Sequence, residues 1–203
     1  MAESVLELLS ARKGHFLLES GYHGELWLGL EILCYQPHRV QAMAADLAKA
    51  ISGWNVDAVC APLIEGAFVG LFVALDLNVD FTYSERFARP GHDGLFPAGY
   101  RIPAGLRDKV RGRRVAIVND VISAGSAVRG TYEDLESCGA NVVGISALMV
   151  LGDAIVEYSA SKAVPLVSLA QAPYHLWAPA ECPLCKAGVA LMDVEGFRKN
   201  FPG

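Results

Sequence analysis

The sequence predicts an α/β domain in which a parallel sheet is flanked by helices and preceded by a small N-terminal hood. Hydrophobic residues make up 53% of the chain and charged residues 19%, which excludes general disorder and favours strands buried on both faces. From residue 57 onward, short apolar runs alternate with helical patterns, as in parallel strands joined by crossover helices. Its 203 residues suit one domain. We divide residues 1–203 into a hood at about 14–35, a core at about 36–172 and a C-terminal tail at about 173–203.

The segment before the sheet is expected to contain two helices and a hairpin. Apolar residues at helical spacing predict the first helix over 3–12. Residues 16–30 alternate loosely around three glycines and indicate a short hairpin, which would form the hood. Pro37 begins the second helix, and Gly53 ends it.

The core is expected to alternate strands with helices. Short apolar runs predict strands over 57–61, 79–83, 114–118, 142–150 and 166–169. Helical periodicity predicts helices over 66–75, 126–138 and 154–161. The polar stretch 84–99 is rich in glycine and proline and is interpreted as a long loop. Loops of that length inside a compact domain are usually functional.

The charge balance argues against nucleic-acid binding. The chain carries 22 acidic and 17 basic residues, a formal net charge of −5, whereas proteins that bind nucleic acids normally show a basic excess or stripe. One basic run precedes a predicted strand. Its members are Arg107, Lys109, Arg111, Arg113 and Arg114. We interpret this run as a solvent-exposed charged segment that leads into the predicted strand.

Three features of the sequence bear on its cellular location. No apolar stretch reaches the roughly 18 residues needed to cross a bilayer, so we expect no membrane association. The first 13 residues contain Glu3 and Glu7 and lack the apolar core of a signal peptide. Five cysteines form an odd count without framework spacing, which suits a reducing compartment. We therefore expect a cytoplasmic protein.

The strongest candidate site follows the strand predicted over 114–118. Apolar residues run directly into Asn119 and Asp120, and small residues with a glycine follow where the next helix begins. Small side chains let an anion approach backbone N–H groups, and the helix dipole favours it. Ser123 and Ser126 offer hydroxyl donors at the end of the sheet where ligands bind. The alternative is an ordinary strand that ends in an Asx turn before a capped helix.

This segment resembles the phosphoribosyl-pyrophosphate motif of type I phosphoribosyltransferases, which has a strand, two acids, two apolar residues and a small-residue loop. Four further segments resemble the orotate phosphoribosyltransferase branch. They are 20–27 in the hood, 61–67 at the pyrophosphate loop, 86–94 at a basic loop ending in His-Gly, and 177–185 in the tail. Together the resemblance covers about residues 15–188.

The resemblance implies a pentosyl-transferring glycosyltransferase of pyrimidine nucleotide biosynthesis. A ring nitrogen of orotate would displace pyrophosphate from the anomeric carbon of phosphoribosyl pyrophosphate and give orotidine monophosphate. Catalysis in this family rests on charge stabilisation and water exclusion. Magnesium (Mg²⁺) is expected through the substrate, bridging pyrophosphate and ribose hydroxyls, with no metal held by the protein alone. The family also implies a homodimer.

The resemblance also assigns roles to residues. The expected catalytic residues are Arg86, Arg89, His92 and Asp120. The expected substrate-binding residues are Glu65, Gly66, Asn119, Asp120, Val121, Ile122, Ser123, Ala124, Gly125, Ser126 and Ala127. In this scheme Asn119 and Asp120 hold the ribose, residues 123–127 the 5′-phosphate, and residues 65–66 the pyrophosphate.

Several positions depart from the family pattern. Asn119 replaces the first of two acids, Ala127 replaces a hydroxyl residue, and arginines replace the lysines of the basic loop. Glu19 stands where a lysine precedes the hood Ser-Gly, and Leu151 stands where an Asp-Arg pair is usual. These departures leave two alternatives open: a phosphoribosyltransferase for another base, or a phosphoribosyl-binding regulator without catalysis.

Other candidate residues fall outside this scheme. Cys182 and Cys185 have zinc-ligand spacing, but a structural zinc site needs four ligands. Additional ligands would have to come from His175, Cys34, Cys60 or Cys138. We interpret the pair as thiols in a surface tail and His23 as a packing residue near the hood glycines. No Gly-x-Ser-x-Gly frame and no P-loop lysine is present.

Overall fold

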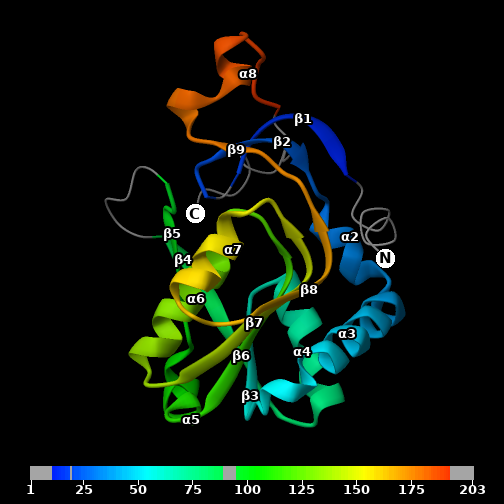
Figure 1. The fold of residues 1–203 in the computed structure, drawn as a ribbon, viewed down its shortest axis with the longest axis vertical. Helices are drawn as coiled ribbons and strands as arrows, with labels where there is room; N and C mark the ends of the chain where they lie inside the picture. Colours follow the sequence, from blue (N-terminus) through cyan, green and yellow to red (C-terminus); the bar gives the residue numbers. More distant parts are fainter. Residues whose placement is uncertain (1–10, 19, 89–94, 193–203) are drawn as a thin grey trace.

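Six strands form the central sheet of the computed structural model, which describes residues 11–18, 20–88 and 95–192 (Figure 1). Their order across the sheet is β5 (Ala98–Arg101), β4 (Asp80–Ala88), β3 (Ala58–Pro62), β6 (Arg114–Ile122), β7 (Asn141–Leu151) and β8 (Leu166–Ala172). All neighbours from β4 across to β8 pair in parallel, and β5 pairs antiparallel with β4 at one edge. The predicted α/β class is confirmed.

Helices cover both faces of this sheet. One face carries α3 (Pro37–Ile51) and α4 (Glu65–Leu77), and the other carries α5 (Arg107–Val110), α6 (Ser126–Ser137) and α7 (Ala154–Ser161). Shorter helical elements are α2 (Leu30–Tyr35), η1 (Ser52–Trp54) and η2 (Ala104–Leu106). Side chains alternate between the faces of a strand. In β6, Ala116 and Val118 therefore join the core under α3 and α4, while Val115 and Ile117 join the core under α6.

The hood is a second sheet built from segments far apart in the sequence. Its strands are β1 (Arg12–Leu17), β2 (His23–Trp27) and β9 (Leu176–Trp177), which pair antiparallel in the order β1-β2-β9. Two short helices follow, η3 (Pro179–Glu181) and α8 (Pro183–Lys186). Figure 1 shows these blue and orange segments side by side above the core. The predicted hairpin is confirmed, and the segment set apart as a tail supplies its third strand.

The strand predicted over 114–118 is too short. β6 continues to Ile122, so Asn119 and Asp120 belong to the strand rather than to the loop after it. The parallel ladder with β7 runs along the whole extension. This pairing outweighs the low strand propensity of Asn and Asp, because strand propensity depends strongly on context.

The stretch predicted as a loop over 84–99 is in large part a β-arm. Residues 84–88 extend β4, and β5 returns beside them with Glu85 opposite Arg101. The hydroxyl groups of Ser84 and Thr131 hydrogen-bond at 2.5 Å and anchor the arm to α6. The polar composition of this edge ribbon conceals its strands, because alternate side chains of β4 there are exposed. Residues 89–94 lie outside the described part of the chain, as does most of the helix predicted over 3–12.

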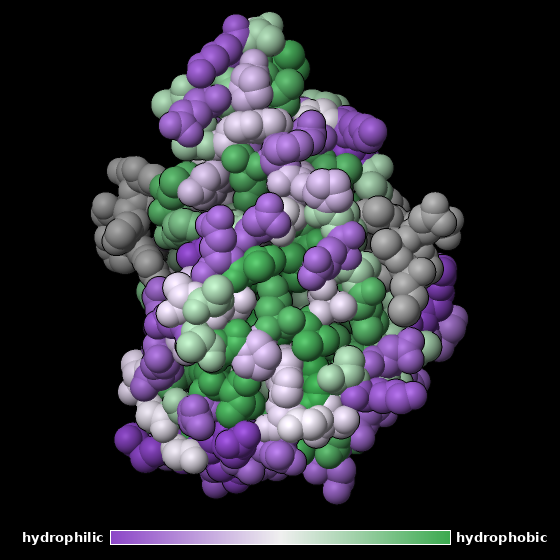
Figure 2. All heavy atoms as spheres, viewed as in Figure 1, coloured by the Kyte–Doolittle hydropathy of each residue, from purple (hydrophilic) through white to green (hydrophobic). Residues whose placement is uncertain are grey.

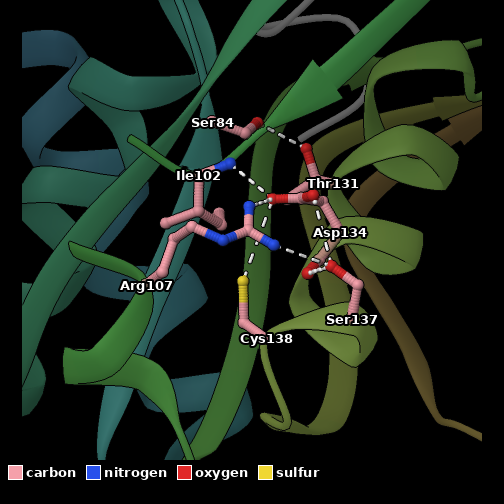
Figure 3. A network of polar contacts seen from close by, with 7 residues as sticks. All are labelled: Ser84, Ile102, Arg107, Thr131, Asp134, Ser137 and Cys138. Atoms are coloured by element: carbon pink, nitrogen blue, oxygen red, sulfur yellow. Dashed lines mark hydrogen bonds and ion pairs between the residues drawn. The ribbon is translucent and has the colours of Figure 1, made fainter. Parts of the chain in front are cut away.

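Asp134 on α6 organises a polar network that includes part of the basic run (Figure 3). Its Oδ2 accepts hydrogen bonds from the Ile102 N–H at 2.6 Å and from Arg107 Nη1 at 2.8 Å. Arg107 Nη2 also donates to Ser137 Oγ at 3.0 Å. The interpretation of the basic run as a solvent-exposed segment is therefore incomplete, since Arg107 cross-links α5 to α6.

The surface is mixed in character on the face shown in Figure 2. Hydrophobic residues gather in the middle of this face, and hydrophilic residues follow its lower rim. Among the described residues, no helix combines the length and the apolar composition that a membrane crossing requires.

Candidate functional site

A cleft of about 1130 Å³ opens between the hood and the carboxyl ends of β3 and β6. Ligands bind at this edge of open α/β sheets. Most predicted site residues that the structure describes line this cleft. They are Glu65, Gly66, Arg86, Asn119, Asp120, Val121, Ile122, Ser123, Gly125, Ser126 and Ala127. Ala124 does not line it, and Arg89, His92 and Glu19 lie outside the described residues.

The connection between β6 and α6 lines the cleft with small residues and leads into the N-terminus of a helix. Gly125 has a φ of +81°, and a Cβ there would lie 2.9 Å from Ile155 Cδ1, so the turn requires glycine. Because α6 begins at Ser126, the N–H groups of its first turn have no acceptor within the helix. Ser123, Ser126 and Ala127 are partly exposed beside them. This arrangement suits a phosphate or another anion.

Asn119 and Gly66 meet at one wall of the cleft. Asn119 is 7% exposed, and its Nδ2 donates to the Val121 carbonyl oxygen at 3.0 Å. Its Oδ1 faces the first turn of α4, where a Cβ on Gly66 would overlap it. Glycine at this position lets the N-terminus of α4 approach β6, so the residues predicted for pyrophosphate and for ribose lie next to each other.

Asp120 is a buried carboxyl group in the same wall, only 4% exposed. Burial, with a smaller contribution from the charge of Glu65, raises the pKa of Asp120 to about 7. Hydrogen bonds from the backbone N–H groups of Val121 and of Asp120 itself oppose this rise. The carboxyl therefore changes protonation near neutral pH, and a cation or a hydroxyl donor beside it would favour its charged form.

The positive charge of the described cleft is small. Arg86, from β4, is the one cationic side chain among the described residues that line it. Leu151 lies in the wall at the position where the resemblance expects an Asp-Arg pair. It is 3% exposed, and it makes that part of the wall apolar.

Sequence patterns do not single out Arg129, yet its side chain joins the connection between β6 and α6 to α7. Its Nε donates to the Ala124 carbonyl oxygen at 3.2 Å, and its Nη2 donates to that of Ala154 at 2.8 Å. The guanidinium carbon lies 4.4 Å from the centroid of the Tyr158 ring, within cation–π range. Ala124 faces a second cavity of about 430 Å³, which Arg129 also lines. The one sequence signal for this role is that Arg129 lies one helical turn after Ser126, at the start of the same helix.

Tyr174 is a second residue that the sequence does not reveal. It lines the cleft beside the hood residues Leu26 and Trp27, and its hydroxyl donates to the Leu26 carbonyl oxygen at 3.0 Å. Burial raises the pKa of Tyr174 to about 12, so the phenol remains a neutral donor at physiological pH. This hydrogen bond ties the chain after β8 to the hood.

The cysteine pair lies elsewhere in the hood. Cys182 is fully buried, so the interpretation of a surface tail is wrong for this thiol, although Cys185 is exposed. Both sulfur atoms lie beside His15 and His23, rather than beside the ligands suggested from sequence. None of these four side chains lines the cleft.

No family model matches the sequence, but curated relatives named orotate phosphoribosyltransferase and solved structures of orotate and adenine phosphoribosyltransferases do. The orotate phosphoribosyltransferase of Nitratiruptor sp. is 32% identical over 189 residues, which cover 87% of this chain and 88% of that protein. That of Caldanaerobacter subterraneus subsp. tengcongensis is 29% identical over 203 residues, covering 97% and 98%. The crystal structure of orotate phosphoribosyltransferase from Aeropyrum pernix matches with a TM-score of 0.64 and 25% identity, over 84% of this chain and 94% of that one.

Proposed function

The chain belongs to the orotate phosphoribosyltransferase family, and from that membership we propose that it converts orotate to orotidine monophosphate. A ring nitrogen of orotate attacks the anomeric carbon of phosphoribosyl pyrophosphate, and the bond from that carbon to pyrophosphate breaks. The leaving pyrophosphate takes the bonding electron pair, and the proton of the attacking ring nitrogen passes to the departing pyrophosphate or to water. One observation carries this proposal: the buried carboxyl of Asp120 and the N-terminus of α6 lie together in a cleft of about 1130 Å³, and helix N-termini suit anions.

The two phosphate-bearing ends of the substrate bind at the N-termini of two helices, α6 and α4. The 5′-phosphate binds at the first turn of α6, where Ser123 and Ser126 add hydroxyl donors. The ribose hydroxyls bind Asp120 and the amide of Asn119, both in β6. The pyrophosphate lies along the start of α4 at Glu65 and Gly66. The contact between Gly66 and Asn119 keeps these two substrate segments adjacent.

The donor set suits a magnesium ion carried in with the substrate. Glu65 and Asp120 are carboxylates close enough for the charge of one to raise the pKa of the other, and Mg²⁺ prefers oxygen ligands and substrate phosphates. When bound, magnesium neutralises charge on pyrophosphate. The protein then holds the ribose through Asp120 and Asn119 and keeps water from the reacting carbon by means of the hood.

Arg86 is expected to close over the pyrophosphate together with Arg89 and His92, as the resemblance implies. Arginine binds phosphate through paired hydrogen bonds but does not titrate near neutral pH. In this scheme Arg86 and Arg89 stabilise developing negative charge rather than donate a proton.

A second candidate function is supported by the apolar character of the wall at Leu151. Orotate is an anion, and the described wall there offers no arginine to bind its carboxylate. A phosphoribosyltransferase for a neutral base, or a phosphoribosyl-binding regulator without turnover, would fit this wall. Turnover assays with several bases separate these alternatives.

We also propose a homodimer in the cytoplasm. Four apolar residues recur at helical spacing at the start and along the outer side of α4 and are exposed. They are Ile64 (61%), Phe68 (48%), Leu71 (42%) and Leu75 (66%). A second copy packed on this stripe would remove it from water. Light scattering of the wild type and of Phe68→Asp tests this: the wild type should be dimeric and the variant monomeric. A monomeric wild type contradicts it.

The function is tested by incubating the purified chain with phosphoribosyl pyrophosphate, magnesium and one base at a time. The bases are orotate, uracil and adenine, and chromatography detects the nucleotide while a coupled assay detects pyrophosphate. We expect equimolar orotidine monophosphate and pyrophosphate with orotate, and no product without magnesium. Turnover with another base alone would identify the alternative enzyme. Calorimetric binding of phosphoribosyl pyrophosphate without turnover would identify the regulator.

A further inference from the structure

Four metal-binding side chains converge in the hood, outside the cleft. They are His15 from β1, His23 from β2, and Cys182 and Cys185 from the turn that contains α8. One potential ligand atom from each lies within 4.8 Å of all the others. We propose that this cluster binds a structural zinc ion that joins the N-terminal hairpin to the C-terminal segment. Figure 1 shows α8 standing directly over these strands.

The distances between the ligand atoms agree with tetrahedral zinc. His15 Nε2 lies 3.0 Å from His23 Nδ1, 3.4 Å from Cys182 Sγ and 3.7 Å from Cys185 Sγ. Cys185 Sγ lies 3.3 Å from His23 Nδ1. Zinc bonds of about 2.0–2.1 Å to nitrogen and about 2.3 Å to sulfur place tetrahedral ligand atoms about 3.3–3.8 Å apart. These four distances lie within a few tenths of an ångström of the tetrahedral values, and the remaining ligand atoms lie no more than 4.8 Å apart, so holding the ion needs a shift of at most about 1 Å.

A second hydrogen bond orients one of the imidazoles. His15 Nδ1 lies 2.7 Å from the Val189 carbonyl oxygen. A carbonyl oxygen can only accept, so Nδ1 carries the proton and Nε2 presents its lone pair to the cluster. Metal-binding histidines are usually held in this way by their other nitrogen.

The surroundings of the cluster suit a closed structural site. His15, His23 and Cys182 are 1%, 5% and 0% exposed, and with Cys185 they complete a four-ligand Cys₂His₂ set. Structural zinc sites are closed by four protein ligands, whereas catalytic sites keep one position open. This set leaves no position for a substrate.

The described hood segments bury little apolar surface of their own, because Phe16 is the one large apolar side chain of β1, β2, β9 and α8 that is fully buried. No described residue of β1, β2, β9 or α8 belongs to either core cluster. Structural units of this size usually need a disulfide or a metal. A zinc ion would connect residues 15 and 182, which are far apart in the sequence. It would also hold the cleft-lining residues between the two histidines, among them Ser20 and Gly21.

The first test is the metal content of the full-length chain, purified without chelators and measured by inductively coupled plasma mass spectrometry. We expect one zinc per chain in the wild type. Cys182→Ser and His15→Ala should each reduce zinc to below about a tenth of that value. Cys34→Ser is the matched control, because Cys34 lies outside the cluster, and it should retain full zinc. Full zinc in Cys182→Ser would overturn the proposal.

The second test uses the wild type alone, so it does not depend on whether a variant folds. The zinc is removed with a chelator under reducing conditions, and the apoprotein is titrated with cobalt(II). We expect saturation at one equivalent, with the intense visible bands of tetrahedral cobalt and thiolate-to-cobalt charge transfer. We also expect the melting temperature to fall on removal of zinc and to recover on its return. Wild type without zinc that fails to bind cobalt, or that contains a disulfide between Cys182 and Cys185, would overturn the proposal.

Discussion

The Oδ1 of Asn119 occupies the space that a side chain at Gly66 would need. Asn119 is held from its other side by the hydrogen bond from Nδ2 to the Val121 carbonyl oxygen. The end of β6 and the start of α4 are therefore positioned against each other by one glycine and one amide. The proposed binding sites for ribose and pyrophosphate depend on this contact.

Gly66→Ala should impair substrate binding more than stability. The new methyl group would displace the Asn119 amide and weaken its hydrogen bond to Val121, at about 1 kcal/mol. Because a displacement of about 1 Å can cost up to about 100-fold in rate, we expect kcat/KM for phosphoribosyl pyrophosphate to fall by about tenfold or more. Gly105→Ala is the control, since nothing lies within 4 Å of a Cβ at that position. Equal kinetics for the two variants would contradict the role of this contact.

Asp120→Asn should stabilise the protein at alkaline pH. The pKa of Asp120 rises from 3.8 to about 7 on folding. Between these values the folded chain keeps a proton that the unfolded chain has lost, so this group lowers stability as pH rises through that window. Above pH 7 the buried carboxylate is charged in both states and lowers the free energy of unfolding by its full amount, on the order of a few kcal/mol. The neutral amide of Asp120→Asn avoids this loss.

Thermal unfolding of the wild type and Asp120→Asn at about pH 4 and about pH 8 checks this effect. The melting temperatures should be close in acid, and the variant should melt higher in alkali. Asp46→Asn, an exposed carboxyl on α3, serves as the control and should show little difference at either pH. A variant that melts lower than the wild type at alkaline pH would contradict the burial argument.

Arg129→Ala should loosen the proposed phosphate-binding connection between β6 and α6. The substitution removes both hydrogen bonds to the Ala124 and Ala154 carbonyl oxygens and the contact with the Tyr158 ring. We expect a loss of about 1–3 kcal/mol in the free energy of unfolding and a larger increase in KM for phosphoribosyl pyrophosphate than decrease in kcat. Arg111→Ala is the control, since the side chain of Arg111 is 66% exposed, and it should change neither quantity appreciably. Unchanged KM in Arg129→Ala would show that the connection keeps its shape without this arginine.

Substitutions at Asp134 should lower the free energy of unfolding without changing kcat. Asp134→Ala leaves the N–H of buried Ile102 without its acceptor and should cost about 1–3 kcal/mol in the free energy of unfolding. Asp134→Asn keeps an oxygen acceptor for Ile102 and should cost less, since the side chain of its charged partner Arg107 is 36% exposed. Urea unfolding and kcat measured below the transition test this pair. A fall in kcat in folded Asp134→Asn would contradict the assignment.

The central strands could be predicted from sequence because they are buried on both faces. Val115 to Val118 form an uninterrupted apolar run, which the two core clusters divide between them. The helix starting at Ser126 was equally clear, since its apolar positions repeat and a glycine precedes it. The candidate site could be located for the same reason, because it follows directly from the end of one strand and the start of one helix.

The rest depends on contacts between segments that local patterns do not connect. Asn119 and Asp120 read as the start of a loop, yet pairing with β7 holds them in a strand. The meeting of Cys182 with His15 spans 167 residues, and each residue alone carries no signal of the other. Arg129 lies on the same helix as the predicted phosphate site, but its partner Ala154 comes from another helix.

The rate of orotidine monophosphate formation, compared between the wild type and Asp120→Asn, tests the proposed function most directly. The assay contains saturating phosphoribosyl pyrophosphate, orotate and magnesium, and circular dichroism verifies that both proteins are folded. We predict turnover by the wild type and a loss of about 100-fold or more in the variant, comparable to removing one group that stabilises the transition state. A folded wild type that forms no product, or a variant as fast as the wild type, would contradict the account.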